Sequence, residues 1–228
     1  MKHLKITIYI GLAFFMFFSG PVFAKKEPPP QVTVDGLVLV PDSKLALVYA
    51  DPEADLGPYT KVKLLDAYVA FKKNWARNQR SGSAIRVTSN DMDRMKATMS
   101  KEFTEVFTQV LEDGGYPVVE ESGEDVLLVR PAIINLNPNA PDTRQAGMSQ
   151  TYVASAGDMS LYIELYDSQT GDIMAKALDR RGDGRNHGFY TWANSATNKA
   201  ASKRILKGWA MILLDALNEA KQREVADR

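Results

Sequence analysis

The most regular hydrophobic pattern in the chain is an alternation between residues 159 and 166. Apolar residues at the odd positions from Met159 to Leu165 alternate with polar or aromatic residues at the even positions. A glycine-containing turn, Asp167–Gly171, follows, and Asp172–Leu178 is a second β-rich run. Alternation on both sides of a short turn predicts a β-hairpin with one buried face.

Five other runs have the length and composition of β-strands. They are Thr33–Val40, Leu45–Tyr49, Lys61–Phe71, Tyr116–Val119 and Val126–Leu136. The alternation within Lys61–Phe71 changes phase at Leu64-Leu65, which predicts a bulge. The run Val126–Leu136 is almost continuously apolar and predicts a strand buried on both faces, while Pro131 within it favours an edge position or a bulge.

Two longer stretches have the spacing of amphipathic helices. Asp91–Glu112 is expected to be capped by Ser89 or Asn90 and ended by Gly114-Gly115. The C-terminal helix is expected to begin at Asn194 or Ser195, and Gly208 within it suggests close backbone packing. The predicted apolar faces are Met92, Met95, Met99, Phe103, Val106, Phe107 and Val110 in the first helix, and Ile205, Trp209, Ile212, Leu213, Ala216, Leu217 and Ala220 in the second.

Together these elements predict an α/β (α+β) fold. We expect a single-domain sandwich of two long helices packed on a mixed, largely antiparallel β-sheet. The domain is expected to cover residues 33–224, with no internal repeat and no second boundary. Residues 25–32 include three consecutive prolines and predict an extended linker.

Residues 1–24 have the three parts of a secretory signal peptide. Lys2–Lys5 is basic, Ile6–Phe18 is apolar but too short to span a bilayer, and Val22-Phe23-Ala24 offers small residues for cleavage. An uncleaved N-terminal anchor is the alternative. Cleavage would remove two of the 28 basic residues and one of the two histidines, so the net charge would become −2. We therefore expect an exported, periplasmic protein.

The composition excludes several functional classes. The chain has no cysteine, so it can form no disulfide, no thiolate zinc site and no acylated N-terminal cysteine. Its 28 basic and 28 acidic residues balance, which argues against a nucleic-acid partner, because such proteins need a positive excess. No phosphate-binding glycine motif is present, and no cofactor is expected.

Catalytic and metal-binding patterns are weak. His187 would be the only histidine left after cleavage, and Asp183 could orient it, which supports a periplasmic hydrolase using carboxylates, or His187 with Asp183, as the alternative function. No serine motif accompanies this pair, and we assign no catalytic residue. Asp51, Glu53 and Asp55 alternate as in a calcium loop, but the glycine and glutamate that such a loop requires are missing. We predict a solvated acidic turn and no metal site.

A basic stretch follows the third predicted strand. Lys72, Lys73, Arg77 and Arg80 are predicted to lie on a solvated polar loop anchored by Trp75. The alternative is a peripheral contact of these side chains with an anionic membrane or an acidic partner. No transmembrane helix is expected in the mature protein.

Several segments, in this order, resemble a bacterial envelope family catalogued as domain of unknown function 3313. The segments are Val34–Pro41, Tyr116–Val119, Leu128–Ala132, Asn139–Asp142, Tyr152–Gly157 and Trp192–Ser195. The resemblance spans roughly residues 34 to 220 and implies a Gram-negative envelope protein with no assigned activity. Many members look like lipoproteins. This chain departs from them because it lacks the cysteine, which favours a free periplasmic form, with a peripheral position at the outer membrane as a further possibility.

The leading hypothesis is a non-enzymatic accessory or binding protein that contacts another envelope component. The long polar stretch Asn139–Gly157 is expected to be a loop and a recognition surface. Arg180–Gly188 is expected to be a second polar loop, followed by an aromatic cluster that either packs in the core or forms a contact surface. The candidate binding residues are Asn139, Asp142, Arg144, Tyr152, Arg181, Asp183, His187, Tyr190 and Trp192.

Overall fold

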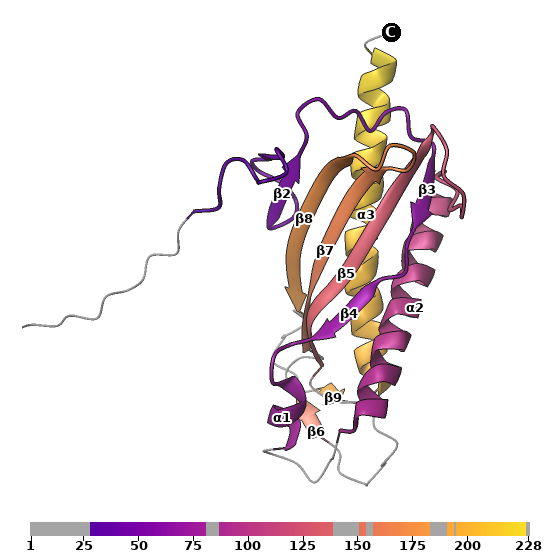
Figure 1. Cartoon of the computed structure of the whole chain (residues 1–228). Helices are drawn as coiled ribbons and strands as arrows, with labels where there is room; N and C mark the ends of the chain where they lie inside the picture. Colours follow the sequence, from indigo (N-terminus) through magenta and orange to yellow (C-terminus); the bar gives the residue numbers. More distant parts are fainter. Residues whose placement is uncertain are drawn as a thin grey trace, which may run out of the picture.

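The computed structural model describes residues 28–80, 87–138, 151–153, 157–182, 191–193 and 195–226, with the backbone alone at 80, 151–153, 191–193 and 195–198 (Figure 1). These residues form an α+β fold in which helices pack on a mixed seven-stranded sheet. The predicted class is therefore confirmed. The signal peptide at 1–24 lies outside the described residues, and the linker and domain boundaries stay predictions.

The main sheet has the strand order β1-β2-β8-β7-β5-β3, and β4 also pairs with β5. The two strands β7 (Gly157–Asp167) and β8 (Ile173–Gly182) form the predicted hairpin. Only the pairs β3 with β5 and β4 with β5 are parallel within this sheet. The other strands are β1 (Val38–Leu39), β2 (Leu47–Ala50), β3 (Lys61–Leu64), β4 (Tyr68–Phe71) and β5 (Val126–Pro138).

Two predicted strands are shorter than expected. Of the run 33–40 only β1 is a strand, because the chain first turns back on itself, with Gly36 at a φ of 83° and its N–H donating to the Thr33 carbonyl. The run 116–119 makes a single parallel bridge, between Val118 and Val62. Both predictions were wrong in extent because short β-rich runs form ladders only where a partner strand is available.

The run 61–71 is not one bulged strand, as its phase change predicted, but two strands separated by residues 65–67. Pro131 explains the interruption. The Leu65 N–H donates to the carbonyl of Val129, and residues two apart in a strand point to the same edge, so the Pro131 nitrogen faces this gap. A proline without an N–H is thereby accommodated inside the central strand β5, and the predicted edge position was wrong. The irregularity in β5 lies later, between Ile134 and Asn137, where Asn135 has a φ of 54°.

The first long helix, α2 (Ser89–Asp113), begins two residues earlier than predicted. Its N-cap is Thr88, whose hydroxyl accepts from the N–H of Asp91 while the Asp91 carboxylate accepts from the N–H of Thr88. This reciprocal capping box satisfies two backbone donors and explains why Thr88, rather than Ser89 or Asn90, starts the helix. Gly114 ends it, as expected.

The second long helix, α3 (Ser195–Ala226), confirms the predicted C-terminal helix. In Figure 1 it runs behind the sheet, with α2 beside it. Gly208 is closely packed, but against a side chain rather than backbone: a Cβ there would lie 2.7 Å from Nη1 of Arg181. Glycine at this position makes room for that guanidinium.

Three predicted loops contain regular structure. The stretch 72–83 includes the short helix α1 (Trp75–Arg80), with Trp75 buried and stacked on Phe71. The stretch 139–157 contains β6 (Thr151–Val153), which pairs with β9 (Thr191–Ala193) in a separate two-stranded sheet. The stretch 180–188 begins inside β8. Polar composition suggested loops in all three cases, but tertiary pairing and the Trp75 anchor override that local signal.

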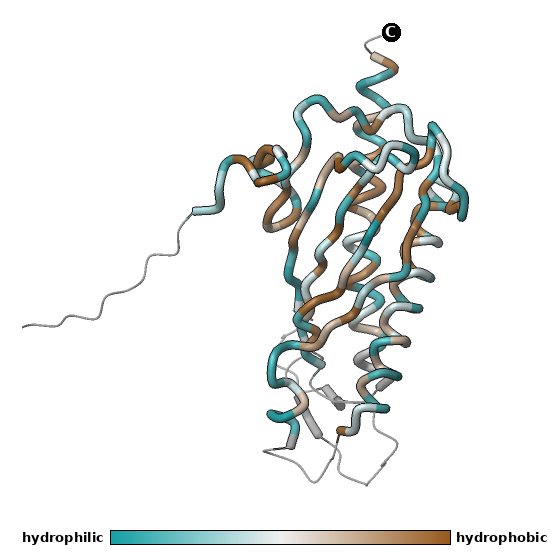
Figure 2. The backbone as a smooth tube through the Cα atoms, viewed as in Figure 1, coloured by the Kyte–Doolittle hydropathy of each residue, from teal (hydrophilic) through white to brown (hydrophobic). Residues whose placement is uncertain are grey.

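The core lies between the two long helices and one face of the sheet. Odd-numbered residues of β7, and those of β5 from Leu127 to Ile133, point toward the helices, and the even-numbered ones point away. Past the irregularity in β5 the buried residue is Leu136. Figure 2 shows hydrophobic residues along β5, whereas α2 mixes hydrophobic and hydrophilic positions, as one buried face requires. The side chains buried most completely include Phe103, Phe107, Leu111, Leu127, Ile133, Leu206 and Leu217.

Candidate functional site

An apolar groove runs between α3 and the β2–β8–β7 part of the sheet. Its volume of about 690 Å³ is in the range of small-molecule sites. The groove is bounded by α3, by β7 and β8, and by the segment 40–56, which includes β2 and is called the outer wall. Since the lining residues of α3 run from Trp209 to Glu224, the groove follows the helix for about 22 Å.

The groove exists because small side chains face each other across it. Ala175 and Ala177 of β8 point toward the helix layer, and Ala216 and Ala220 of α3 point toward the strands. Leucine and isoleucine side chains of β7 and α3 complete the floor, namely Leu161, Ile163, Leu165, Ile212 and Leu213. The surface is therefore suited to a hydrocarbon group, whose burial stabilises by about 25 cal/mol per Å².

A buried polar contact fixes the end of the groove at Trp209. The Asp179 carboxylate accepts from the indole Nε1 of Trp209 at 2.7 Å, from Nε of Arg181 at 2.9 Å and from the backbone N–H of Ala46 at 3.2 Å. The Arg181 guanidinium also lies 5.8 Å from the centre of the Trp209 ring. These bonds join β8, α3 and the segment before β2, and they hold the indole in one orientation.

An ion pair ties the outer wall to the helix. Lys44 Nζ lies 3.0 Å from Oδ2 of Asp215 and 3.6 Å from Oε1 of Glu219, both on α3. The hydrogen bond to Asp215 raises the pKa of Lys44, so the side chain stays charged at neutral pH. The three side chains are well exposed, so the pair positions the segment more than it stabilises the fold.

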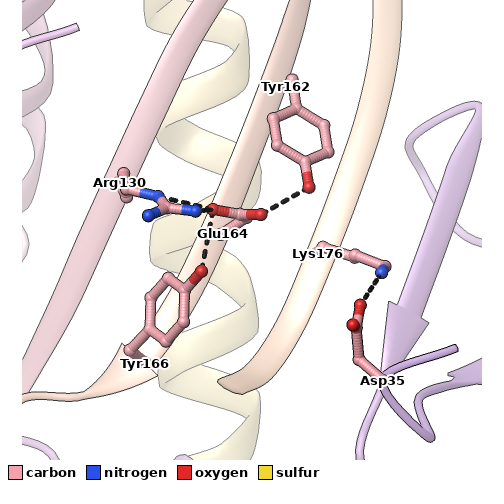
Figure 3. A network of polar contacts seen from close by, with 6 residues as sticks. All are labelled: Asp35, Arg130, Tyr162, Glu164, Tyr166 and Lys176. Carbon is pink, nitrogen blue, oxygen red and sulfur yellow. Dashed lines mark hydrogen bonds and ion pairs between the residues drawn. The ribbon is translucent and has the colours of Figure 1, made fainter. Parts of the chain in front are cut away.

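The opposite face of the sheet carries a polar network (Figure 3). Arg130 of β5 lies directly opposite Glu164 of β7 and donates to it through Nε at 2.6 Å. The hydroxyls of Tyr162 and Tyr166 donate to the same carboxylate at 2.5 and 2.9 Å. On the neighbouring β8, Lys176 pairs with Asp35 of the N-terminal segment. The Glu164 side chain is only 10% exposed although no described helix covers this face, because its own partners shield it.

The network changes the proton affinities of its members. Burial alone would raise the pKa of Glu164, but the hydrogen bonds from Tyr162, Tyr166 and Arg130 outweigh it and hold the pKa below its usual value. Burial and the bond to Glu164 raise the pKa of Tyr162 and of Tyr166. All four groups therefore keep their ordinary charge at neutral pH.

Most candidate binding residues lie outside the described residues: Asn139, Asp142, Arg144, Asp183, His187 and Tyr190. The backbone positions of Tyr152 and Trp192 are directly opposite each other in the β6–β9 pair. Arg181 is described, and it packs against Trp209 at the end of the groove. Asp179 is occupied by the three donors given above. The hydrolase alternative, which depends on His187 with Asp183, stays a prediction.

The basic stretch is only partly described. Lys72, Lys73 and Arg77 are exposed, around the start of α1, and the side chain of Arg80 lies outside the described residues. A membrane contact through this stretch stays a prediction. In the described part of the chain no helix is both long enough and apolar enough to cross a bilayer, and no group of His, Asp or Glu side chains could hold a metal ion.

The groove was missed by sequence reasoning. The sequence pattern predicts core positions for Ala216 and Ala220 and a solvated acidic turn for Asp51 and Glu53, whereas the structure places all four in the groove lining. One signal was available. Two inward positions of the second hairpin strand, 175 and 177, are alanines, whereas the inward residues of the first strand are Met159, Leu161, Ile163 and Leu165. Small residues at inward positions of a strand indicate either close packing or a hollow, and the sequence alone does not separate the two.

Comparisons with solved structures return distant resemblances. The PelC dodecamer from Paraburkholderia phytofirmans is 13% identical over 70% of this chain and 94% of that chain, with a TM-score of 0.33. Protein XCC0632 from Xanthomonas campestris is 12% identical over 78% and 94%, with a TM-score of 0.38. A putative neuraminyllactose-binding hemagglutinin homolog from Helicobacter pylori is 9% identical over 76% and 95%, with a TM-score of 0.35. No curated protein matches the sequence.

The family comparison is more informative than these structures. A family model described as a protein of unknown function, DUF3313, matches residues 38–211. The match covers well over half of the chain and includes most of the groove, from Val40 to the Trp209 end, as well as the Glu164 network. The resemblance expected from the ordered sequence segments is confirmed, and the chain belongs to the DUF3313 family.

Proposed function

We propose that this chain is an exported, non-enzymatic binding protein of the bacterial envelope that holds an apolar ligand in the groove beside α3. The observation that carries the proposal is the groove itself, an apolar hollow of about 690 Å³ next to a well-packed core. Larger side chains at Ala175 or Ala216 could fill this hollow, and substitutions that fill a cavity commonly stabilise a protein. Alanine at these positions therefore favours a binding role for the space.

Two features support binding rather than fortuitous loose packing. The wall formed by residues 40–56 is held by the ion pair of Lys44 and by the Asp179 bond to the Ala46 N–H, so the hollow has a defined boundary. Trp209 at one end is fixed by Asp179, which gives a rigid aromatic surface. Rigid walls lower the ordering cost that a ligand must overcome on binding.

The test is titration of the purified chain with N-phenyl-1-naphthylamine, an uncharged dye that fluoresces when it leaves water. We expect saturable binding at one site. Ala216→Trp, which fills the groove, should weaken binding at least tenfold, because Ala216 lines the floor. Met211→Trp adds the same side chain at an exposed position of α3 and should leave binding unchanged. Binding that is absent, or that is equally strong in the Ala216→Trp variant, would contradict the proposal.

Export is supported by the basic, apolar and small-residue pattern of residues 1–24. In a Gram-negative host we expect the chain in the osmotic-shock fraction, beginning at Lys25. An Ala24→Tyr variant should accumulate unprocessed, because signal peptidase requires a small residue before the cleavage site. A full-length, cytoplasmic chain would reject the export part of the proposal and leave the groove untouched.

A further inference from the structure

The two ends of the groove differ in charge. Five carboxylates line it, on the loop after β2 and on the last turns of α3: Asp51, Glu53, Asp55, Glu219 and Glu224. Of the two cationic residues in the lining, Arg223 lies on the last turns of α3, whereas the Lys176 side chain lies on the opposite face of the sheet. The Trp209 end, in contrast, is lined by aliphatic side chains of β2, β7 and β8. The groove therefore has an apolar interior and an acidic mouth.

Backbone contacts hold the loop carboxylates at the mouth. Oδ1 of Asp51 accepts from the N–H of Glu53 at 2.9 Å, and Oδ1 of Asp55 accepts from the N–H of Gly57 at 2.8 Å. Gly57 packs so closely on α3 that a Cβ there would lie 2.9 Å from Cβ of Glu224. The loop and the end of the helix therefore meet, and their carboxylates share one opening.

The three loop carboxylates, Asp51, Glu53 and Asp55, outnumber the cations at this mouth. Lys176 pairs with Asp35 on the other face of the sheet, and Arg223, whose Nε donates to the Glu219 carbonyl at 3.3 Å, adds one positive charge. Lys44, on the outer wall, interacts with Asp215 and Glu219. The negative end of the α3 dipole adds to the same sign of potential. A low-dielectric wall beside the carboxylates strengthens their attraction for a cation.

We infer that the groove takes a cationic amphiphile. Its aliphatic chain lies along α3 toward Trp209, and its positively charged head lies between the 51–57 loop and the last turns of α3. The inference rests on the proposed function and adds the chemical class of the ligand. Apolar burial supplies the affinity, and the carboxylates supply the selection against anionic chains of equal length, such as fatty acids.

The test compares three amphiphiles that share a twelve-carbon chain, used as monomers below their aggregation concentrations. Dodecylammonium, dodecanol and dodecanoate each compete with N-phenyl-1-naphthylamine for the intact chain at pH 7. We expect dodecylammonium to displace the dye at a concentration at least tenfold below that of dodecanoate, with dodecanol between them. The ratio of the displacing concentration of dodecanoate to that of dodecylammonium should decrease as salt is raised from 20 to 300 mM, because salt screens exposed charges.

Two triple variants assign the selectivity to the mouth. The first variant combines Asp51→Asn, Glu53→Gln and Asp55→Asn. In it, the concentrations of dodecylammonium and dodecanoate that displace the dye should differ by no more than threefold, and the concentration of dodecanol that displaces the dye should not change. Glu120→Gln, Glu121→Gln and Glu124→Gln remove the same number of charges from the segment before β5, outside the groove lining, and should leave the ratio unchanged. An equal loss of selectivity in both variants would overturn the inference in favour of a general charge effect.

The remaining outcomes separate the inference from the proposed function. If dodecanoate competes as well as dodecylammonium, while Ala216→Trp still abolishes dye binding, the groove binds apolar ligands without charge selection and the inference fails alone. If no amphiphile competes and the dye does not bind, the proposed function fails with it. If a basic amphipathic peptide competes more than tenfold better than dodecylammonium, the occupant is a peptide and the inference is overturned.

Discussion

The two halves of the helix-covered sheet face share α3 but are filled differently. Beneath β3, β4 and β5, the stacked rings of Phe103 and Phe107 from α2 fill the space, with ring centres 3.9 Å apart and both side chains fully buried. Beneath β2 and β8, the facing residues include Ala175 and Ala216, and α2 does not line the space. Two helices cover one part of a wide sheet closely, and side-chain volume decides whether the rest is solid or hollow.

This difference separates stability from binding within one domain. The packed half provides the dispersion contacts and apolar burial that stabilise the fold. The hollow half gives up part of that stabilisation and gains a surface that a ligand can cover. Substitutions in the first half are therefore expected to change the free energy of unfolding, and substitutions in the second to change ligand affinity. Four measurements test this separation.

The largest effect is expected from Phe107→Ala. Removing a fully buried ring next to Phe103 should lower the free energy of unfolding by about 3–5 kcal/mol, measured by urea denaturation, because the cavity can close only partly. Met211→Ala, on an exposed part of α3, should change it by about 0.5 kcal/mol or less. A loss below about 1 kcal/mol for Phe107→Ala would mean that the two halves are equally loosely packed.

A smaller loss is expected from Asp179→Asn, at the junction of the two halves. The carboxylate accepts three hydrogen bonds, and the amide nitrogen of asparagine cannot accept. We expect a loss of about 1.5–3 kcal/mol and several-fold weaker dye binding, because Trp209 is no longer held. The control Asp172→Asn changes an exposed carboxylate and should alter neither measurement. Unchanged dye affinity in Asp179→Asn would show that Trp209 does not contribute to the site.

The most direct comparison is one substitution made twice on α3. Ala210→Leu enlarges a fully buried position and should cost about 1–3 kcal/mol through overpacking. Ala216→Leu places a larger side chain in the groove and should change the free energy of unfolding by less than about 1 kcal/mol. The same substitution should weaken dye binding severalfold. Equal stability costs in the two variants, measured by thermal and urea unfolding, would show that the groove closes in solution.

The smallest effect, Glu164→Gln, tests the outer face of the sheet. Glutamine keeps an acceptor for Tyr162 or Tyr166, so the loss at pH 7 should be about 1 kcal/mol. The folded-state pKa of Glu164 is lowered, so its stabilisation is present above the unfolded pKa of about 4.3 and disappears as pH falls through the folded value. The difference between the variant and the parent should therefore shrink below about pH 4. Dye binding at pH 7 should not change, and a change would connect the two faces.

The local elements could be predicted from the sequence because local patterns contain them. Alternation alone places the β7–β8 hairpin, and helical spacing places Phe103 and Phe107 on one face of α2. The ends of elements were less accurate, because caps depend on reciprocal contacts such as that between Thr88 and Asp91. Pro131 could not be placed, because only the interruption between β3 and β4 makes room for a proline inside the sheet.

By itself, then, the sequence determined the class of fold, the buried faces of both helices and the absence of cysteine chemistry. Only the tertiary structure decided which small residues would face each other and which charges would meet. Ala175 and Ala216 belong to different elements, as do Asp55 and Glu224. The packing of α3 against the sheet brings the two alanines to face each other across the groove and the two carboxylates to the same end of it. A hollow depends on the distance between layers and on the volumes facing it, and neither is a property of a single segment.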